Sequence, residues 1–159
     1  MDIRVGYGFD VHQLVTNREF YLGGIKIEHH KGALGHSDAD VLIHAICDAL
    51  LGAANLRDIG FHFPNNNPTY KNIDSKKLLQ EVIALLKKNN WIVLNVDATV
   101  VLEQPKINPH IPAMQQALSN CMGIDMDRIS IKATTNESMG YVGREEGITA
   151  SAVALIQRV

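Results

Sequence analysis

Apolar and polar residues follow two different periods along this chain, one typical of strands and one typical of helices. Strand-like segments, rich in Val, Ile, Thr and aromatic residues, cover residues 3–14, 20–27, 91–102, 129–134 and 148–157. Apolar residues at helical spacing cover about residues 37–52, 75–88 and 112–121. The pattern therefore predicts strands at both ends of the chain, with helices and further strands between them.

Polar residues and glycines at the ends of these segments predict where the helices begin and end. Ser37, followed by Asp40 three residues later, has the spacing of a capping box, and Ser75 is expected to cap the second helix. Gly123 is expected to end the third helix. Residues 63–68, rich in Asn and Pro, are expected to form a loop.

The last predicted strand is apolar on both faces. Ile148 and Ile156 share one face with the alanines between them, whereas Val153 and Leu155 lie on the other. We expect helices to cover one face and self-association to cover the other. The predicted fold is a single α+β domain over residues 1–159, with a mixed four-stranded sheet, an N-terminal β hairpin and helices on one face of the sheet.

Composition and charge limit the class of partner. The chain has 159 residues and a net charge of -2, and its charges of both signs are interspersed. It therefore has no basic stripe for nucleic acid and no Lys/Arg block for a membrane surface. No apolar run is long enough to cross a bilayer, and the N-terminus has no apolar signal core, so we expect a cytoplasmic protein. Cys47 and Cys121 are isolated and are expected to be buried, reduced thiols.

A candidate metal site begins near the N-terminus. Asp10 and His12 project to the same side of an extended strand, and His44 can reach them from the helix that follows. Two imidazoles and a carboxylate suit zinc and leave one position open, as a catalytic metal requires.

A polar stripe on the first helix supports this interpretation and leaves an alternative open. Asp40, His44 and Asp48 are spaced by four residues and share one helix face, which an ordinary solvated surface would also explain. The dense run of His36, Asp38 and Asp40 favours a metal or phosphate site. Asp48 is equally consistent with a group that orients a ligand imidazole or binds substrate and with an exposed carboxylate.

Three other polar features have a plain structural explanation beside a functional one. Ser37 stands where a helix is expected to begin, which suits either phosphate or a simple cap. Thr134, Thr135 and Glu137 offer hydroxyls and a carboxylate for a hard cation such as Mg²⁺, although threonine is also common in strands. Lys106 could balance phosphate charge or be solvated.

Several motifs, taken in order, resemble one enzyme family over essentially the whole chain. They are GFDVHQL, LGGIKI, GHSDADVLIHAICDALLGAANLRDIGFHFP, NVDATVVLEQPKINPHIPAM and IKATTNESMGYVGREEGITASAVALI. The chain resembles the 2-C-methyl-D-erythritol 2,4-cyclodiphosphate synthases of the non-mevalonate isoprenoid pathway.

The resemblance implies a phosphorus-oxygen lyase. It would convert 4-diphosphocytidyl-2-C-methyl-D-erythritol 2-phosphate to the cyclic diphosphate by attack of the 2-phosphate on the β-phosphorus, with release of CMP. It further implies a homotrimer whose sheets face inward and whose active sites lie between subunits. Asp10, His12 and His44 would bind zinc, and Glu137 would bind Mg²⁺ or Mn²⁺.

The resemblance also implies residue roles, with His36 and Thr135 as catalytic donors. The contacts expected around the methylerythritol phosphate are His36, Ser37, Asp58, Ile59, Gly60, Phe63, Pro64, Asn65, Asn66 and Asn67. Those expected around the cytidine and its phosphates are Leu102, Glu103, Gln104, Pro105, Lys106, Ile107, Asn108, Ala133, Thr134 and Thr135, and Asn136 and Glu137 are further expected substrate contacts. The remaining substrate contacts are Asp10, Val11, His12, Tyr141 and Arg144.

The chain departs from the family pattern at a few positions. Asn65 and Asn67 stand where many members carry Asp, Asn136 replaces a more usual hydroxyl residue, and Ser151 stands where some members have a glutamate near the trimer axis. Two other functions remain open: a metal-dependent phosphohydrolase that uses the same ligands to activate water, and a non-enzymatic trimeric metal or ligand module.

Overall fold

Strands from both ends of the chain lie side by side in one mixed sheet. The computed structural model describes residues 2–159. The five strands have the order β4-β1-β7-β5-β6, and β2 and β3 form a separate hairpin. The strands are β1 (Ile3–Thr16), β2 (Phe20–Leu22), β3 (Ile25–Ile27), β4 (Lys31–Leu34), β5 (Trp91–Val101), β6 (Ile129–Thr134) and β7 (Gly147–Arg158). The α-helices are α1 (Val41–Ala53), α2 (Ile59–His62), α3 (Ser75–Lys88), α4 (Ile111–Met122) and α5 (Gly140–Gly143).

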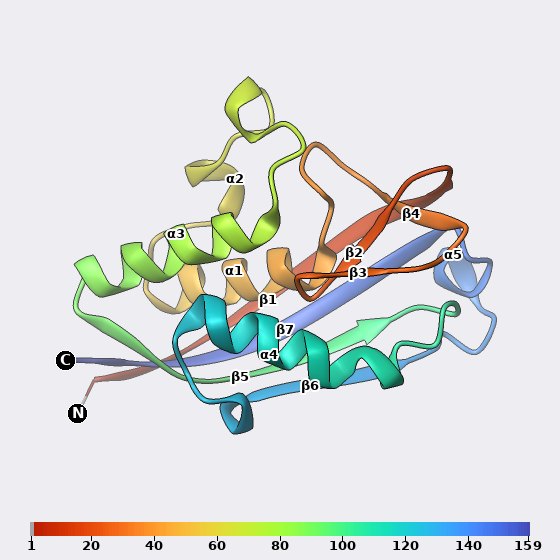
Figure 1. Cartoon of the computed structure of the whole chain (residues 1–159). Coiled ribbons are helices and arrows are strands. Elements are labelled where there is room, and N and C mark those ends of the chain that lie inside the picture. The colour runs from red at the N-terminus through yellow and green to blue at the C-terminus, as the bar shows by residue number, and fades with distance from the viewer. Residues whose placement is uncertain (1) are drawn as a thin grey trace.

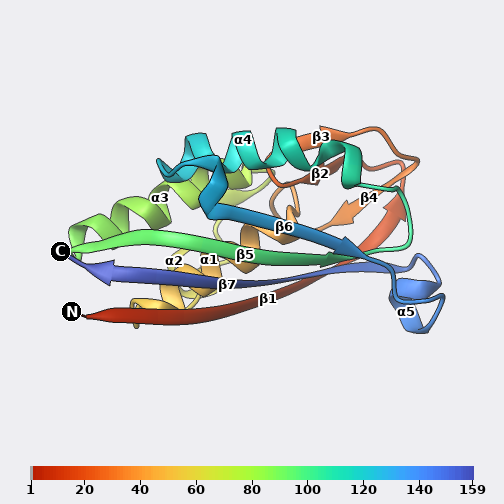
Figure 2. The same ribbon diagram turned by 90° about the horizontal axis from the view of Figure 1, so that it is seen from below.

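The helices α1, α3 and α4 cover one face of the sheet, as predicted (Figures 1 and 2). In the sheet, β7 runs antiparallel to both β1 and β5, and β5 runs parallel to β6. Both chain termini lie at one end of the sheet, and β4 and α5 lie at the other (Figure 1). The fold is therefore α+β with a mixed sheet, as the sequence predicted.

The predicted number of strands was wrong, because the sheet has five strands and not four. The pairing of β1 with β7 ends at Gln13, and β1 continues to Thr16. The backbone groups beyond this point pair with β4, where Leu14 lies opposite Ala33 and Thr16 opposite Lys31. β4 has only four residues and no clear alternation, so the sequence pattern did not reveal it.

The first helix packs directly on β1 because two glycines face it. A Cβ atom on Gly6 would lie 1.9 Å from the carbonyl oxygen of Ala49, and one on Gly8 would lie 1.9 Å from that of Ala45. Any larger residue would force the helix away from the strand. This close approach brings the N-terminal turn of α1 beside the residues of β1 that follow Gly8.

The predicted helix caps at Ser37 and Ser75 were wrong. α1 begins at Val41, and its cap is Asp40, whose carboxylate accepts the backbone N–H of Ile43. The carboxylate of Asp74 caps α3, so Ser75 is the first residue of that helix. Asp and Ser cap helices about equally well, so the sequence alone did not separate neighbouring candidates. Gly123 ends α4 in the left-handed conformation, as predicted.

Apolar side chains remain open on the sheet face opposite the helices. Alternate residues of β1 point away from α1, and Val5 and Tyr7 are 66% and 65% exposed. Phe9, Val11 and the neighbouring Val153 of β7 are also exposed. The helix-covered face differs, because the β7 residues that face α1 are buried.

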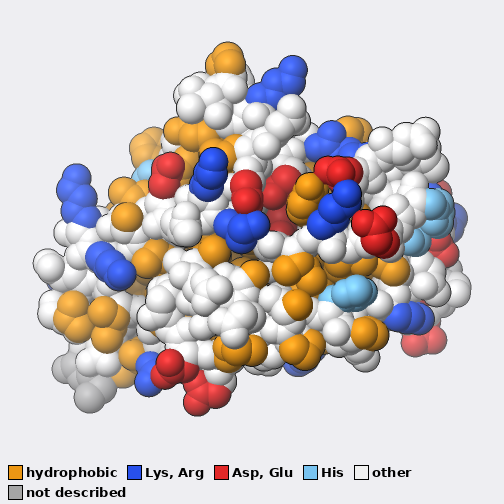
Figure 3. All heavy atoms as spheres, viewed as in Figure 1, with side chains coloured by type: hydrophobic (Ala, Val, Ile, Leu, Met, Phe, Trp, Pro, Cys, Tyr) orange, Lys and Arg blue, Asp and Glu red, His pale blue; other side chains and the backbone are white. Residues whose placement is uncertain are grey.

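Charges of both signs are interspersed on the face seen in Figure 3. Within residues 2–159, none of the helices is both long and apolar enough to cross a membrane. Cys47 and Cys121 are free thiols; Cys47 is buried, as predicted, and Cys121 is only partly buried.

Candidate metal centre and neighbouring cavities

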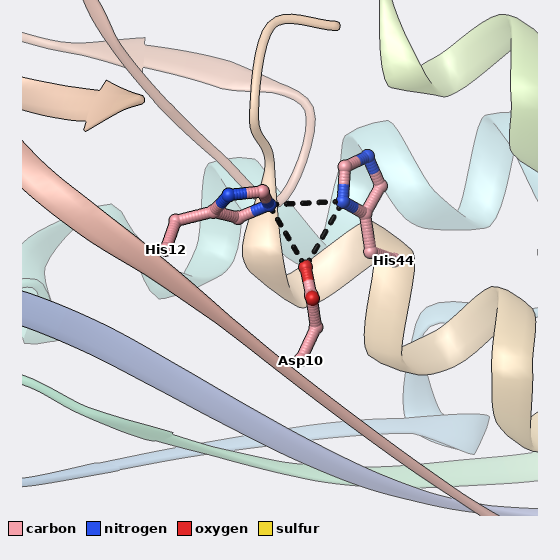
Figure 4. Close-up of side chains that lie close together, drawn as sticks. All are labelled: Asp10, His12 and His44. Atoms are coloured by element: carbon pink, nitrogen blue, oxygen red, sulfur yellow. Dashed lines mark hydrogen bonds and ion pairs between the residues drawn. The ribbon is translucent and has the colours of Figure 1, made fainter. Parts of the chain in front are cut away.

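Asp10, His12 and His44 converge on one point between β1 and α1 (Figure 4). One carboxylate oxygen of Asp10, Oδ2, lies 2.9 Å from His12 Nε2 and 3.0 Å from His44 Nδ1. The two ring nitrogens are 3.2 Å apart. Within residues 2–159, this is the one group of three or more His, Cys, Asp or Glu side chains that could hold a metal ion together.

The positions of these residues follow from how α1 lies on β1. Gly6 contacts Ala49 and Gly8 contacts Ala45, so the helix runs antiparallel to the strand. Asp10 is the next residue on the same face of β1, and it therefore meets His44 at the N-terminal turn of α1. The glycines at two alternate positions before Asp10 and His12 thus let α1 pack closely on β1, which brings the side chains of the cluster together.

The donor atoms fit a divalent metal ion. In a tetrahedral zinc site with bonds of about 2.0 Å, ligand atoms lie about 3.3 Å apart. The three distances in this cluster, 2.9, 3.0 and 3.2 Å, are close to that value. The far ring nitrogens also have partners, as is usual for metal-bound histidines: His12 Nδ1 lies 3.0 Å from the carbonyl oxygen of Leu34, and His44 Nε2 lies near two serine hydroxyls.

The charges within the cluster shift two pKa values in opposite directions. Burial disfavours ionisation of Asp10, but hydrogen bonds from His12 and His44 outweigh it and hold the pKa of Asp10 well below its usual range. Burial likewise disfavours charge on His44, but the hydrogen bond and the negative charge of Asp10 outweigh it and raise the pKa of His44. The cluster therefore concentrates an ionised carboxylate between two imidazoles.

A cavity of about 200 Å³ opens beside the metal centre. Many of the residues predicted for the methylerythritol phosphate line it, namely His36, Ser37, Ile59, Gly60, Phe63 and Asn65. Asp58, Pro64, Asn66 and Asn67 do not line it, although the backbone carbonyl of Asn67 lies 3.1 Å from His36 Nε2.

The polar stripe expected on the first helix divides into two environments, the hairpin turn and the metal cavity. Asp40 is fully buried, and its carboxylate accepts the backbone N–H groups of Gly23 and Gly24 in the hairpin turn, as well as that of Ile43. Asp48 lines the metal cavity and accepts the backbone N–H of Ile59, and burial raises its pKa. Of the three, only His44 belongs to the metal cluster.

A second cavity, of about 240 Å³ and called the cytidine cavity below after the substrate group predicted for it, lies where β5 and β6 end. Its lining residues were all predicted for the cytidine side of the substrate: Leu102, Pro105, Lys106, Ile107, Asn108, Ala133, Thr134 and Thr135. It shares no lining residue with the metal cavity. β7 and β5 lie between β1 and β6, so the distance between β1 and β6 is about 14 Å at the usual strand spacing.

The remaining predicted residues lie around the loop after β6. The carboxylate of Glu103 accepts the backbone N–H groups of Asn136, at 2.8 Å, and of Ser138, at 3.3 Å. Glu137 lies between these two residues with an exposed side chain, 3.4 Å from the Thr135 hydroxyl. Glu103 therefore holds the backbone on both sides of Glu137, and the Glu137 carboxylate is exposed, with the Thr135 hydroxyl donating to it.

Four predicted contacts point to solvent within one chain. Val11 lies on the open face of the sheet, Gln104 is exposed, and Tyr141 is exposed on α5. The guanidinium of Arg144 pairs with Glu146 at the surface. None of the four lines either cavity.

Sequence reasoning missed residues that complete the metal cavity. Tyr70, Ile73 and Leu78 supply apolar lining, and the Ser75 hydroxyl lies 3.0 Å from His44 Nε2. The sequence pattern indicates Ser75 only as a candidate helix cap. Its contact with His44, 31 positions away, depends on tertiary packing and has no local sequence pattern.

Comparison with known proteins identifies the family. Residues 3–157 match the YgbB family. The chain belongs to the YgbB family. It is 64% identical to the 2-C-methyl-D-erythritol 2,4-cyclodiphosphate synthase of Bacteroides fragilis, over the whole of both chains.

Two solved structures have the same fold. The bifunctional IspDF of Campylobacter jejuni matches with a TM-score of 0.96 and 36% identity; the match covers 99% of this chain and 43% of that longer one. IspF of Plasmodium falciparum, in complex with CDP, matches with a TM-score of 0.86 and 33% identity over 98% of this chain and 96% of that one.

These comparisons confirm the resemblance drawn from the motifs. They also confirm the predicted function, which is cyclodiphosphate synthesis in the non-mevalonate isoprenoid pathway by a phosphorus-oxygen lyase. A metal-binding site is consistent with this activity, since the Asp10, His12 and His44 cluster is present.

Proposed function

We propose that this chain converts 4-diphosphocytidyl-2-C-methyl-D-erythritol 2-phosphate to the cyclic diphosphate at a site built by two neighbouring copies. The observation that carries the proposal is the cluster of Asp10, His12 and His44, whose donor atoms lie 2.9–3.2 Å apart beside a cavity. Two nitrogen donors and one oxygen donor favour zinc and leave one position for a diphosphate oxygen.

A second divalent ion would be held by Glu137. Its exposed carboxylate and the neighbouring Thr135 hydroxyl are hard oxygen groups, which suit Mg²⁺ or Mn²⁺. A single protein carboxylate is enough for such an ion when the substrate diphosphate supplies further oxygens. The two ions would supply positive charge that offsets the repulsion between the attacking phosphate and the diphosphate.

The residues of the chain then position the reacting groups. A 2-phosphate oxygen forms a bond to the β-phosphorus as the bond from that phosphorus to CMP breaks, so no water and no protein nucleophile enters the balance. The Thr135 hydroxyl would donate a hydrogen bond to a phosphate oxygen as negative charge shifts. His36 would contact the phosphate from the metal cavity, with its ring oriented by the backbone carbonyl of Asn67.

The separation of the two cavities supports a site shared between subunits. In one chain the metal cavity lies on β1 and the cytidine cavity lies at the ends of β5 and β6, with β7 between β1 and β5. A substrate that joins methylerythritol phosphate to cytidine would pass from the metal cavity of one subunit to the cytidine cavity of the next. The open apolar face, with Val5, Tyr7 and Phe9, would form the core of the homotrimer, its sheets facing inward.

The proposed partner is thus a small nucleotide diphosphate, and the proposed location is the cytoplasm. The free thiols of Cys47 and Cys121 support a reducing compartment. Nucleic acid and membrane are not proposed as partners, since the chain has a net charge of -2 and its charges of both signs are interspersed along the sequence.

Phosphorus NMR of the products tests the proposed reaction. With the proposed substrate, Mg²⁺ and zinc-loaded protein, we expect the signals of a cyclic diphosphate and of CMP in equal amounts. Acyclic diphosphate or free monophosphates would instead identify a metal-dependent phosphohydrolase, which activates water at the open metal position. Substrate that stays unchanged while zinc remains bound would identify a non-enzymatic module.

A further inference from the structure

A buried hydroxyl stands behind the metal ligand His44. Ser75, the first residue of α3, is 0% exposed, and its Oγ lies 3.0 Å from His44 Nε2, the ring nitrogen that faces away from Asp10. The Ser75 hydroxyl also donates to a carboxylate oxygen of Asp38. The other oxygen of that carboxylate accepts the backbone N–H of Ser75 at 3.0 Å. Asp38 therefore holds Ser75 by both its backbone and its side chain.

The donors and acceptors in this chain of contacts determine where the protons lie. An ionised carboxylate only accepts hydrogen bonds, so the hydroxyl hydrogen of Ser75 points at Asp38. The Ser75 oxygen can then only accept from His44, which requires a hydrogen on Nε2. Nδ1, the atom that faces Asp10 and His12, donates to the Asp10 carboxylate in the metal-free chain. When a metal ion takes the place of this Nδ1 hydrogen, the hydrogen on Nε2 remains and the Nδ1 lone pair is the one that binds.

We propose that Asp38 and Ser75 are positioning residues that fix His44 in the tautomer able to bind metal through Nδ1. This inference rests on the metal site of the proposed function and extends it to two residues outside that site. A parallel arrangement exists at His12, where the carbonyl oxygen of Leu34, also only an acceptor, lies 3.0 Å from Nδ1 and leaves Nε2 free. Each imidazole thus has a hydrogen-bond acceptor on its far nitrogen. For His12 the acceptor is the carbonyl oxygen of Leu34. For His44 it is the Ser75 hydroxyl, which Asp38 orients.

A nearby serine provides a matched comparison. Ser37 Oγ lies 3.2 Å from His44 Nε2, and it accepts the backbone N–H of Ala39. Within residues 2–159 no carboxylate accepts the Ser37 hydroxyl hydrogen, so that hydrogen is able to turn toward Nε2 or away from it. Ser37 therefore does not impose a tautomer, whereas Ser75 does.

The test is the zinc affinity of the full-length chain, measured by competition with a chromogenic chelator. Ser75→Ala should weaken zinc binding about 10–100-fold, the usual effect of removing a partner behind a ligand histidine. Its fold should persist, because Asp74 still caps α3 and alanine is a good helix former. Asp38→Asn should weaken zinc similarly, because an amide group can donate to Ser75 Oγ and release the serine hydrogen toward Nε2.

Four further measurements make the test decisive. The double variant of Asp38→Asn and Ser75→Ala should bind zinc as Ser75→Ala alone does, because Asp38 acts through Ser75. The visible spectrum of the Co²⁺-substituted protein should change in both single variants. Ser37→Ala should lower zinc affinity less than Ser75→Ala does, and melting temperatures of the metal-free variants should match that of the parent protein.

The inference would be overturned by zinc affinity that is unchanged in Ser75→Ala, by an equal loss in Ser37→Ala, or by fully additive losses in the double variant. Failure of the proposed function has a different signature, because the unmodified chain would then bind no zinc or form no cyclic product. A zinc-binding, active parent protein with unaltered variants would therefore reject the positioning role alone.

Discussion

In the metal cavity the side chains of Asp10, His12 and His44 contact one another and are 26%, 15% and 13% exposed. In the cytidine cavity, by comparison, the lining residue Thr134 is exposed, as is Glu137 on the loop that follows it. Each ring nitrogen of the metal cluster has a partner inside the chain. Around the cytidine cavity, by contrast, it is backbone groups that are held, by the carboxylate of Glu103.

The difference indicates that one chain supplies all the contacts that organise the metal cavity but leaves the polar groups near the cytidine cavity exposed. Packing of α1 on β1 is enough to bring the metal ligands together, and this packing is internal to the chain. The second region presents polar groups to solvent, where substrate, a second ion and a neighbouring copy would complete it. The expected effects of substitutions should divide along this line.

The largest effect is expected from removing a metal ligand. His44→Ala should abolish zinc binding and reduce turnover by more than about 100-fold, because a direct ligand contributes more than the groups behind it. Elemental analysis of the purified protein and CMP release would measure both. The matched control is His30→Ala, an exposed histidine outside both cavities, which should keep zinc and activity. Full zinc content in His44→Ala would remove His44 from the ligand set.

The next effect is expected on the open sheet face. Val5→Lys places a charge in the proposed trimer core, where burial of an unpaired charge is costly, while an isolated chain leaves the lysine solvated. We expect light scattering to show monomers that keep one zinc per chain and lose turnover. Ala113→Lys, on the exposed side of α4, should stay trimeric and active. A trimeric Val5→Lys protein would argue against this face as the interface.

A smaller effect is expected at the cytidine side. Thr135→Val keeps the shape of the side chain and removes its hydroxyl, so turnover should fall about 10²–10³-fold, as for other donors that stabilise developing charge. Zinc content and trimer size should not change. Thr16→Val, at the exposed end of β1, is the matched control and should leave CMP release unaltered. Normal turnover in Thr135→Val would refute its role as a donor.

The smallest effect is expected in the pH dependence of the metal-free chain. The pKa of His44 is raised above its ordinary value of 6.5, so its contribution to stability is present below that pH and is lost as pH rises through the folded pKa. The lowered pKa of Asp10 acts in the acid range, where stability is lost as pH falls below 3.8.

Urea unfolding in the presence of a chelator would measure this dependence. The free energy of unfolding of the parent chain, minus that of His44→Gln, should be larger at about pH 6 than at about pH 9. The opposite slope, or no slope, would show that the Asp10–His44 contact does not stabilise the metal-free fold.

Much of the fold followed from periodicity. The three long helices and the strands β1, β5, β6 and β7 lie within a few residues of the predicted segments, because each carries a clear apolar face. The short strand β4 and the true caps at Asp40 and Asp74 did not follow. Their identity depends on partners far along the chain or on which of several equivalent side chains reaches a backbone N–H.

The sequence by itself determined the candidate metal cluster and the family, because Asp10, His12 and His44 lie in motifs whose spacing and order are specific. Only the tertiary structure decided what surrounds them. It brought Ser75 of α3 to His44, turned Asp40 toward the hairpin, and separated the predicted substrate residues into two cavities. The physical reason is that local pattern fixes which face a side chain occupies, whereas packing between distant segments fixes what that side chain meets.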